Sequence, residues 1–391
     1  ERLMKSSIPS LASSEPPALT DDATLAAALD CLSANMSLEM HGPCTLQTLF
    51  QVLLRAASRA DSIEHTTEQL TDVPCGNGIR HHLNKLDDMD SLEEQLNRAL
   101  QHRLPAKVCN HRHKLAIDLH LIPYYGQPGP ASALYIYRSQ VKASTTSFFA
   151  YASIYLIRRH HRVTLAIHPV RCDETLVATI TYLLAQLNPL HIKVKHLYLD
   201  RGFYGVPVIR WLKALRIPFI MAAVVRGKRG GTRQFCRGRR SYSTTYTLTS
   251  GLHGSVDCLL AVICCYRRGR WGRQGVDYLL YVIHNVRVAL HGIRKQYSQR
   301  FGIETSYRLK NSCRIRTTTR NPAVRLLFVA LAFVLINLWI YLLWTYLSRS
   351  RRGGRKVERE LFPLKTMLEF IAQAVGKQFP LCWSVCLLGT P

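Results

Sequence analysis

Three carboxylates stand at positions from which they could act together on a phosphodiester bond. Asp118 lies inside the apolar run LAIDLHLI, Asp200 ends the run LYLD, and Glu304 lies in the helix-like segment KQYSQRFGIETSYRLKN. Phosphodiester cleavage by two metal ions needs a few converging carboxylates, and Mg²⁺ or Mn²⁺ prefers such hard oxygen ligands. We therefore predict that Asp118, Asp200 and Glu304 are catalytic and bind two ions of Mg²⁺ or Mn²⁺.

The runs that carry these carboxylates predict a fold of the α/β class. A right-handed crossover would place the strands of Asp118 and Asp200 side by side, with their carboxyl ends facing a ligand crevice. Taken singly, each aspartate could instead cap a turn, and Glu304 could belong to an exposed ion-pair helix. The predicted strands cover 114–122, 133–141, 162–170, 195–200, 218–225 and 278–286, and the predicted helices cover 175–187, 206–217, 291–311 and 322–347.

Side chains that could bind phosphate surround Glu304 on its predicted helix. Tyr297, Arg300 and Arg308 recur at helical spacing and share its face. Arginine pairs two N–H groups with phosphate oxygens, so these neighbours could position a phosphate while the carboxylate binds metal. Arg201 directly follows Asp200 and could neutralise charge there.

The charge distribution predicts a polyanionic partner. The chain has 391 residues with 52 Lys and Arg against 25 Asp and Glu, a net charge of +27. Residues 1–110 are acidic, whereas 111–350 hold 36 Lys and Arg but only seven acids. So basic a folded segment repels itself unless a polyanion binds it, and nucleic acid is the usual one. The alternative interpretation is that these charges only keep the protein soluble.

Asp173 and Glu174 are the candidates that would replace Asp118 if Asp118 is not part of the site.

The order of these elements resembles the RNase H-like core of DDE transposases, over about residues 110–345. More narrowly, it resembles the IS4-type group of insertion-sequence transposases, including ISH3-type relatives. The family's Asp-x-Gly-Phe motif at the second aspartate is matched by the run that starts at Asp200, DRGF.

A second motif of that group, Tyr-x2-Arg-x3-Glu-x6-Lys, is matched at Tyr297, Arg300 and Glu304. Its lysine is not matched, because position 311 is Asn. In the family this lysine grips the terminal DNA, so we expect Lys310 or Arg308 to take its place.

The resemblance implies a fold and an activity. The fold is an RNase H-like core, a mixed five-stranded sheet with flanking helices, joined to a β-rich insertion and an N-terminal helical domain. The activity is metal-dependent strand cleavage at element ends, followed by attack of the 3′-OH on target DNA. The implied partners are double-stranded DNA and a second copy of the chain, without a small-molecule cofactor.

The resemblance and the composition together give a domain plan. We expect a helical DNA-binding domain at 1–110, the catalytic core at 111–225 and 278–350, a β-rich basic insertion at 226–277, and a basic linker and tail at 351–391. The insertion could track DNA, or it could be a merely solvated basic loop.

Residues 62–86 have the pattern of two short helices around a tight turn. The second helix would carry Arg80 and Lys85, as the recognition helix of a helix-turn-helix does. A plain helical hairpin has the same pattern. We predict that this segment contributes to recognition of DNA ends.

The run 326–347 has 22 residues, one Asn and no charge, and a cluster of arginines follows it. By length and polarity it passes as a transmembrane helix. A helix that is apolar all round can also be the central helix of a large core. We predict a core helix and no membrane contact.

The twelve cysteines show no zinc-binding spacing, and we expect reduced thiols in a cytoplasmic, nucleoid-associated protein. Two other functions stay open on sequence grounds. One is a non-catalytic basic DNA-binding protein, and the other is a basic protein anchored in a membrane by 326–347.

Overall fold

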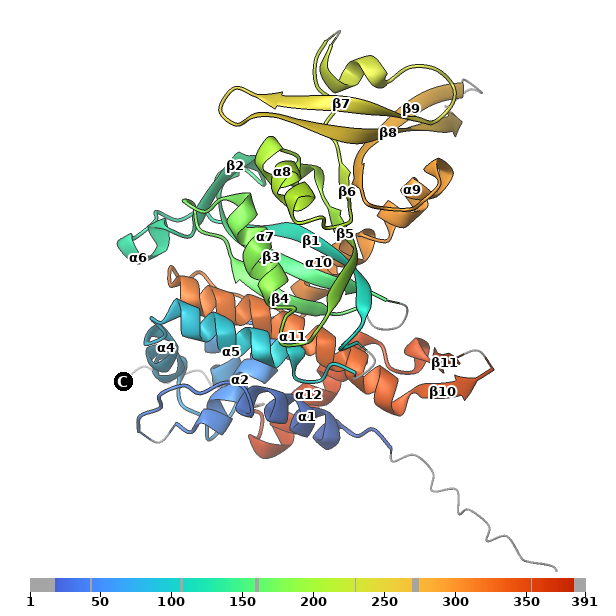
Figure 1. Cartoon of the computed structure of the whole chain (residues 1–391). Helices are drawn as coiled ribbons and strands as arrows, with labels where there is room; N and C mark the ends of the chain where they lie inside the picture. Colours follow the sequence, from blue (N-terminus) through green and yellow to red (C-terminus); the bar gives the residue numbers. More distant parts are fainter. Residues whose placement is uncertain are drawn as a thin grey trace, which may run out of the picture.

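The computed structural model describes residues 18–42, 44–105, 108–158, 162–228, 230–268, 274–352 and 354–382. A layer of helices lies beneath a mixed sheet, and a β-rich part extends from the opposite side of that sheet (Figure 1). The last residues of the chain, 383–391, and the first, 1–17, lie outside the described part, so the sequence analysis of the terminal segments is only partly tested.

The centre of the molecule is a mixed sheet with the strand order β4-β3-β1-β5-β6. β3 is antiparallel to β1 and β4, whereas β1, β5 and β6 run parallel. This is the five-stranded RNase H-like arrangement, and it confirms the predicted fold class. The strands are β1 (Arg112–Pro123), β3 (Thr145–Ile157), β4 (Thr164–Pro169), β5 (Lys193–Leu199) and β6 (Phe219–Ala222).

The prediction for the second core strand was wrong. The predicted strand at 133–141 corresponds to β2 (Ile136–Lys142), which pairs with the first half of β3 at the edge of the sheet. The second core strand is β3 itself, which the sequence analysis missed. Residues 148–157 of β3 are buried on both faces. Such a strand shows no alternation of apolar and polar residues.

The sheet continues into the insertion. β9 (Gln274–His284) pairs with β6 of the core and also with β8 (Gly254–Arg268), which pairs with β7 (Tyr242–Ser250). Within the described residues one sheet therefore contains nine strands. The predicted β-rich character of 226–277 agrees with this arrangement, and β9 joins the insertion to the core without a break (Figure 1).

Helices cover both faces of the sheet. α7 (Leu176–Ala185) packs on β3 and β4, and α8 (Val206–Ala214) contacts β7 and β8, while α10 (Phe301–Asn311) lies against β1. The predicted helix at 291–311 is two helices, α9 (Leu290–Ser298) and α10 (Phe301–Asn311), which meet at Gln299 and Arg300. A short helix, α6 (Pro130–Ala133), precedes β2.

The helical layer combines both ends of the chain. Its N-terminal members are α1 (Asp21–Ser33), α2 (Leu46–Arg59), α3 (Ile63–Gln69), α4 (Gly76–Asn84) and α5 (Met89–Gln101). α12 (Leu364–Gln378) packs against α1 and α2, and the hairpin of β10 (Ser348–Arg351) and β11 (Gly354–Val357) precedes it. The description of 351–391 as a linker and tail was therefore wrong for its described part.

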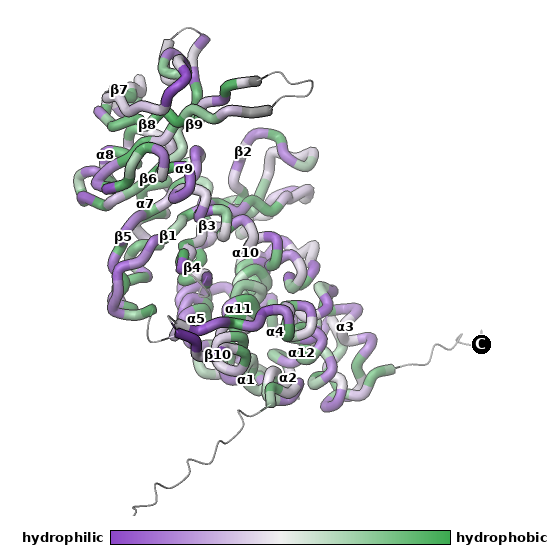
Figure 2. The backbone as a smooth tube through the Cα atoms, turned by 90° about the vertical axis from the view of Figure 1, so that its right-hand side faces the viewer, coloured by the Kyte–Doolittle hydropathy of each residue, from purple (hydrophilic) through white to green (hydrophobic). Residues whose placement is uncertain are grey.

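The apolar helix α11 (Pro322–Tyr346) is buried between this layer and the sheet (Figure 2). It is the one helix in the described residues that is long and apolar enough to cross a membrane, and 89% of its most apolar window is buried inside the protein. Asn337 in its centre accepts from Thr164 N (3.1 Å) and donates to Thr164 O (2.7 Å) and Leu100 O (3.0 Å). These bonds join α11 to β4 and α5, as expected for a central core helix.

Candidate active site

The three predicted carboxylates converge. Asp118 lies within β1 opposite Ser153 of β3, and Asp200 directly follows β5, the parallel neighbour of β1. Glu304 lies in the first turn of α10, which packs against β1. Residues distant in sequence are thus brought to one place by two adjacent strands and a helix, as the sequence analysis predicts for a shared site.

One guanidinium contacts all three carboxylates. Arg300 Nη1 lies 3.1 Å from Asp118 Oδ2, and Arg300 Nη2 lies 2.7 Å from Glu304 Oε1 and 3.7 Å from Asp200 Oδ1. Arg300 is only 4% exposed, and its Nε has no hydrogen-bond partner among the described residues. A phosphate contact was predicted for Arg300, but not this ion pairing, although the spacing of Arg300 and Glu304 by four residues is a signal for an ion pair.

The protein holds Asp118 in a buried position. Its Oδ1 accepts from Leu119 N at 3.0 Å, and its backbone oxygen accepts from the Tyr307 hydroxyl at 3.1 Å. Burial raises the pKa of Asp118 to about 6; the Arg300 charge acts in the opposite direction, and the negative charges of Asp200 and Glu304 add to the rise. A nearby cation favours the ionised form of such a buried carboxylate, and Arg300 supplies one.

Tyr297 contacts the residues next to the carboxylates. Its hydroxyl donates to Leu199 O at 3.1 Å, directly before Asp200, and the Arg300 guanidinium lies 5.6 Å from the centre of its ring. Tyr297 is buried, so in this structure it positions the end of β5 and the guanidinium. The predicted contact of Tyr297 with DNA phosphate gains no support from this placement.

The structure argues against the predicted DNA contact of Lys310. The side chain is 0% exposed, and its Nζ lies 2.5 Å from His120 Nε2. Burial lowers the pKa of Lys310 to about 7, and it lowers that of His120 to about 3. Of the two replacements considered for the missing lysine, only Arg308 is exposed.

Two predicted basic residues flank the carboxylates at the surface. Arg308 lies one turn beyond Glu304 on α10, and Arg201 directly follows Asp200 in a short 3₁₀ turn; both are exposed. Both could therefore reach a bound phosphate.

Arg80 and Lys85 lie away from the carboxylates, at α4 in the helical layer (Figure 1). The predicted pair of helices is present as α3 and α4. Arg80 is exposed but paired with Glu64 of α3 at 2.8 Å, and Lys85 is exposed. A role of either residue in DNA binding stays a prediction.

The two alternative carboxylates have partners elsewhere in the structure. Asp173 is exposed and paired with Arg171 at 3.0 Å. Glu174 lies 2.9 Å from His168 Nε2, and Glu93 lies 2.8 Å from His168 Nδ1. The largely buried group of Glu93, His168 and Glu174 joins α5 to β4. Neither Asp173 nor Glu174 therefore belongs to the cluster around Arg300.

The donor set suits a hard divalent cation. Asp118, Asp200 and Glu304 offer only carboxylate oxygens, the ligands that Mg²⁺ and Mn²⁺ prefer. The Asp200 and Glu304 side chains are 37% and 42% exposed, which leaves an open side for a phosphate. In the part of the chain that the structure describes, no three His, Cys, Asp or Glu side chains are already grouped as a metal site. Arg300 contacts each of the three carboxylates in this arrangement.

The chain is similar to known proteins in sequence family and in fold. Residues 112–338 match the family model described as "Transposase DDE domain". The fold is similar to the cryo-EM structure of piggyBac transposase in a synaptic complex with hairpin DNA. The TM-score is 0.53 at 11% identity, over 90% of this chain and 76% of that one. No curated protein sequence matches the chain.

Proposed function

The chain belongs to the family of transposase DDE domains, and we propose that it cleaves DNA at the ends of an insertion-sequence element and transfers the freed 3′-OH into target DNA by a two-metal mechanism. The observation that supports this proposal is the convergence of Asp118, Asp200 and Glu304 on one guanidinium. Three carboxylates with purely structural roles would not need to share one guanidinium at a partly exposed site.

The two ions of Mg²⁺ or Mn²⁺ would be held by these three carboxylates and would activate the attacking oxygen and stabilise the leaving one. Asp118 must be ionised to act, and Arg300 favours its ionised form. Arg308 and Arg201 lie at the exposed edge, where a guanidinium can pair with phosphate oxygens of the reacting strand. Tyr297 holds the Asp200 end of β5 in place through Leu199.

The finer assignment is to the IS4-type group with ISH3-type relatives. It is supported by the DRGF run at Asp200 and by the spacing of Tyr297, Arg300 and Glu304. In this proposal the protein acts as a homodimer that joins two element ends, with α3 and α4 contributing to end recognition. It works in the cytoplasm on nucleoid DNA.

Nicking of supercoiled plasmid by the purified full chain tests the proposal. With Mg²⁺ or Mn²⁺ the wild type should convert the plasmid to nicked and linear forms, and EDTA should stop the reaction. Asp118→Asn and Glu304→Gln should each lower the rate by a factor of at least about 10³, since each removes a ligand used in the transition state.

Asp173→Asn is the matched control, because it makes the same chemical change at an exposed aspartate outside the cluster. It should cleave like the wild type. If Asp118→Asn keeps metal-dependent cleavage, the assignment of Asp118, Asp200 and Glu304 as the catalytic carboxylates is wrong. A wild type that binds DNA but never cleaves it would point to a non-catalytic DNA-binding protein.

A further inference from the structure

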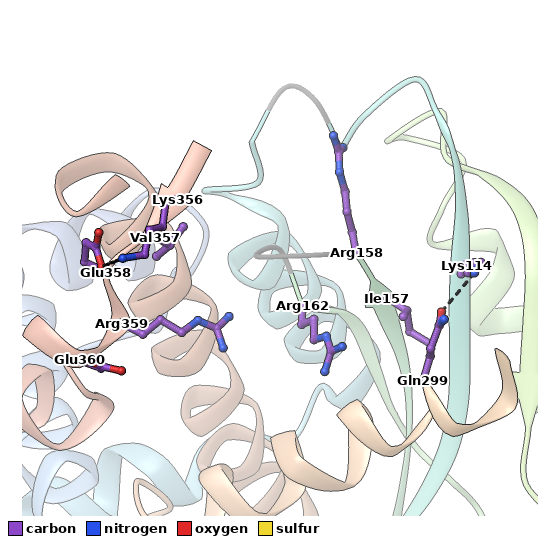
Figure 3. Close-up of a pocket in the computed structure, with 10 residues that line it drawn as sticks. All are labelled: Lys114, Ile157, Arg158, Arg162, Gln299, Lys356, Val357, Glu358, Arg359 and Glu360. Atoms are coloured by element: carbon purple, nitrogen blue, oxygen red, sulfur yellow. Dashed lines mark hydrogen bonds and ion pairs between the residues drawn. The ribbon is translucent and has the colours of Figure 1, made fainter. Parts of the chain in front are cut away.

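A concentration of positive charge lies next to the α9–α10 corner, where Gln299 is one of the lining residues. Here a cleft with a cavity volume of about 880 Å³ opens between the core and the segment that follows α11 (Figure 3). Five cations from separate parts of the chain line it, against two acids, Glu358 and Glu360. The cations are Lys114, Arg158, Arg162, Lys356 and Arg359.

Two of these arginines lie across the cleft from each other. Figure 3 shows Arg162 and Arg359 on opposite walls of the cleft, with the Arg359 side chain extending into the space between the walls. Among the described residues no carboxylate is paired with either of them, whereas Glu358 is occupied by Lys356 at 2.8 Å. Two arginines that line one cleft without a paired carboxylate repel each other, and a phosphate bound in the cleft would reduce this repulsion.

The hairpin that borders the cleft carries further unbalanced charge. Arg349 of β10 lies directly opposite Lys356 of β11, a like-charge cross-strand pair that destabilises a hairpin. Arg351 and Arg352 are also exposed. Arg355 is held over the ring of Trp344, at 5.3 Å from its centre. A two-stranded ribbon with so many cations is poorly suited to a structural role alone.

The cleft and the catalytic carboxylates are neighbours along the same elements. Lys114 of the cleft precedes Asp118 by four residues on β1, which corresponds to about 13 Å at about 3.3 Å per residue. Gln299 lines the cleft and accepts from Lys114 Nζ at 3.2 Å, and the next residue is Arg300. At about 3.4 Å per nucleotide, this spacing corresponds to about four nucleotides of a strand.

We propose that the β10–β11 hairpin and the cleft beside it bind the phosphate backbone of DNA a few nucleotides away from the reacting bond. This inference rests on the proposed function for the identity of the polyanion. The contacts are made by Arg162 and Arg359 in the cleft and by Arg349 on the ribbon. They are independent of base sequence, because they reach phosphates only.

The salt dependence of DNA binding tests the inference. The probe is a 30-base-pair duplex of arbitrary sequence, since phosphate contacts dominate such binding. Arg162→Ala/Arg359→Ala should reduce the slope of log K against log salt by about 1 to 2, about 0.9 for each lost phosphate contact. Arg349→Thr should reduce it by about 0.9 without lowering Tm, because the substitution also relieves a like-charge pair.

A matched control removes two exposed cations elsewhere. Arg98→Ala/Lys365→Ala changes α5 and α12, where both residues form ion pairs within their own helix. Its slope should equal that of the wild type. An unchanged slope in both the cleft double variant and Arg349→Thr overturns the inference, as does a lowered Tm for Arg349→Thr.

The same experiment separates this inference from the proposed function. Asp118→Asn should bind the duplex with the wild-type slope, because the carboxylates make no backbone contact of this kind. If the wild type cleaves DNA while the cleft variants bind the duplex with the wild-type slope of log K against log salt, only the inference about the cleft fails. If the slope of log K against log salt is reduced in the cleft variants but the wild type never cleaves DNA, only the proposed catalytic function fails.

Discussion

Arg300 Nη1 lies 3.1 Å from Asp118 Oδ2, and this ion pair ties the α9–α10 corner to the central strand of the sheet. The same guanidinium also contacts Glu304 and Asp200. In the absence of metal, one buried positive charge therefore keeps three mutually repelling carboxylates together. Arg300, for which a phosphate contact was predicted, therefore also balances the negative charge of the three carboxylates.

Replacement of Arg300 tests whether its charge stabilises the three carboxylates. In Arg300→Met the three carboxylates lose their shared cation, so the metal-free variant should be about 3 kcal/mol less stable to unfolding at pH 7.5. Addition of Mn²⁺ should raise its Tm more than that of the wild type, because the ion no longer competes with a guanidinium. Thermal denaturation with EDTA and with a Mn²⁺ series measures both effects. Arg308→Met, at an exposed position, is the control, and an equal Mn²⁺ response in all three proteins contradicts the prediction.

The raised pKa of Asp118 gives a pH dependence with a defined sign. Its folded pKa of about 6 lies above the ordinary 3.8, so the folded protein holds the proton more tightly than the unfolded chain. Stability in EDTA should therefore fall from about pH 4 to above pH 6, by up to about 3 kcal/mol for this group. The free energy of unfolding of Asp118→Asn should not fall in this way. The stability of this variant relative to the wild type should therefore rise over the same pH range.

Urea denaturation at pH 4 and pH 7.5 measures that difference. Asp173→Asn is again the control: Arg171 holds the pKa of Asp173 below its ordinary value, so this variant should show the opposite trend. A difference between Asp118→Asn and wild type that stays constant with pH would mean that the pKa of Asp118 is not raised in the folded protein.

The sequence predicted the three carboxylates because each lies on an element with a clear local pattern. β1, β5 and α10 are short apolar or periodic segments, and their adjacency follows from crossover handedness. β3 escaped prediction because burial on both faces removes the alternation that marks a strand. The burial of Lys310 also escaped it. Lys310 lies six residues after Glu304, and only the packing of α10 on β1 and α11 decides that it points inward.

His168 should stabilise the junction between the helical layer and the core. Burial lowers its pKa, but hydrogen bonds to Glu174 and Glu93 outweigh burial and raise it to about 9. A pKa raised above the ordinary 6.5 gives stability that is fully present below pH 6.5 and is lost as the pH rises through 9. His168→Gln should therefore lose about 3 kcal/mol at pH 6 and less than half of that at pH 10. Denaturant unfolding at both values checks this.

The control for His168 is His65→Gln, because His65 is an exposed histidine that also lies near two acids. Its effect should stay below about 0.5 kcal/mol at either pH. A loss in His168→Gln that is equal at pH 6 and pH 10 would mean that the imidazole acts through packing and not through its charge.

Asn337 provides a test of the place of α11 in the fold. In a membrane-spanning helix, Asn337→Leu would remove a costly polar group and favour insertion. In the core helix seen here, the same change leaves Thr164 N, Thr164 O and Leu100 O without their partner, at about 1 to 3 kcal/mol for each buried group. We expect Asn337→Leu to lower the free energy of unfolding by about 3 kcal/mol, measured with urea on the full chain. Thr345→Leu, at an exposed position of α11, is the control and should change it by less than about 0.5 kcal/mol. A more stable Asn337→Leu protein that sediments with membranes would overturn the core-helix assignment and the proposed function with it.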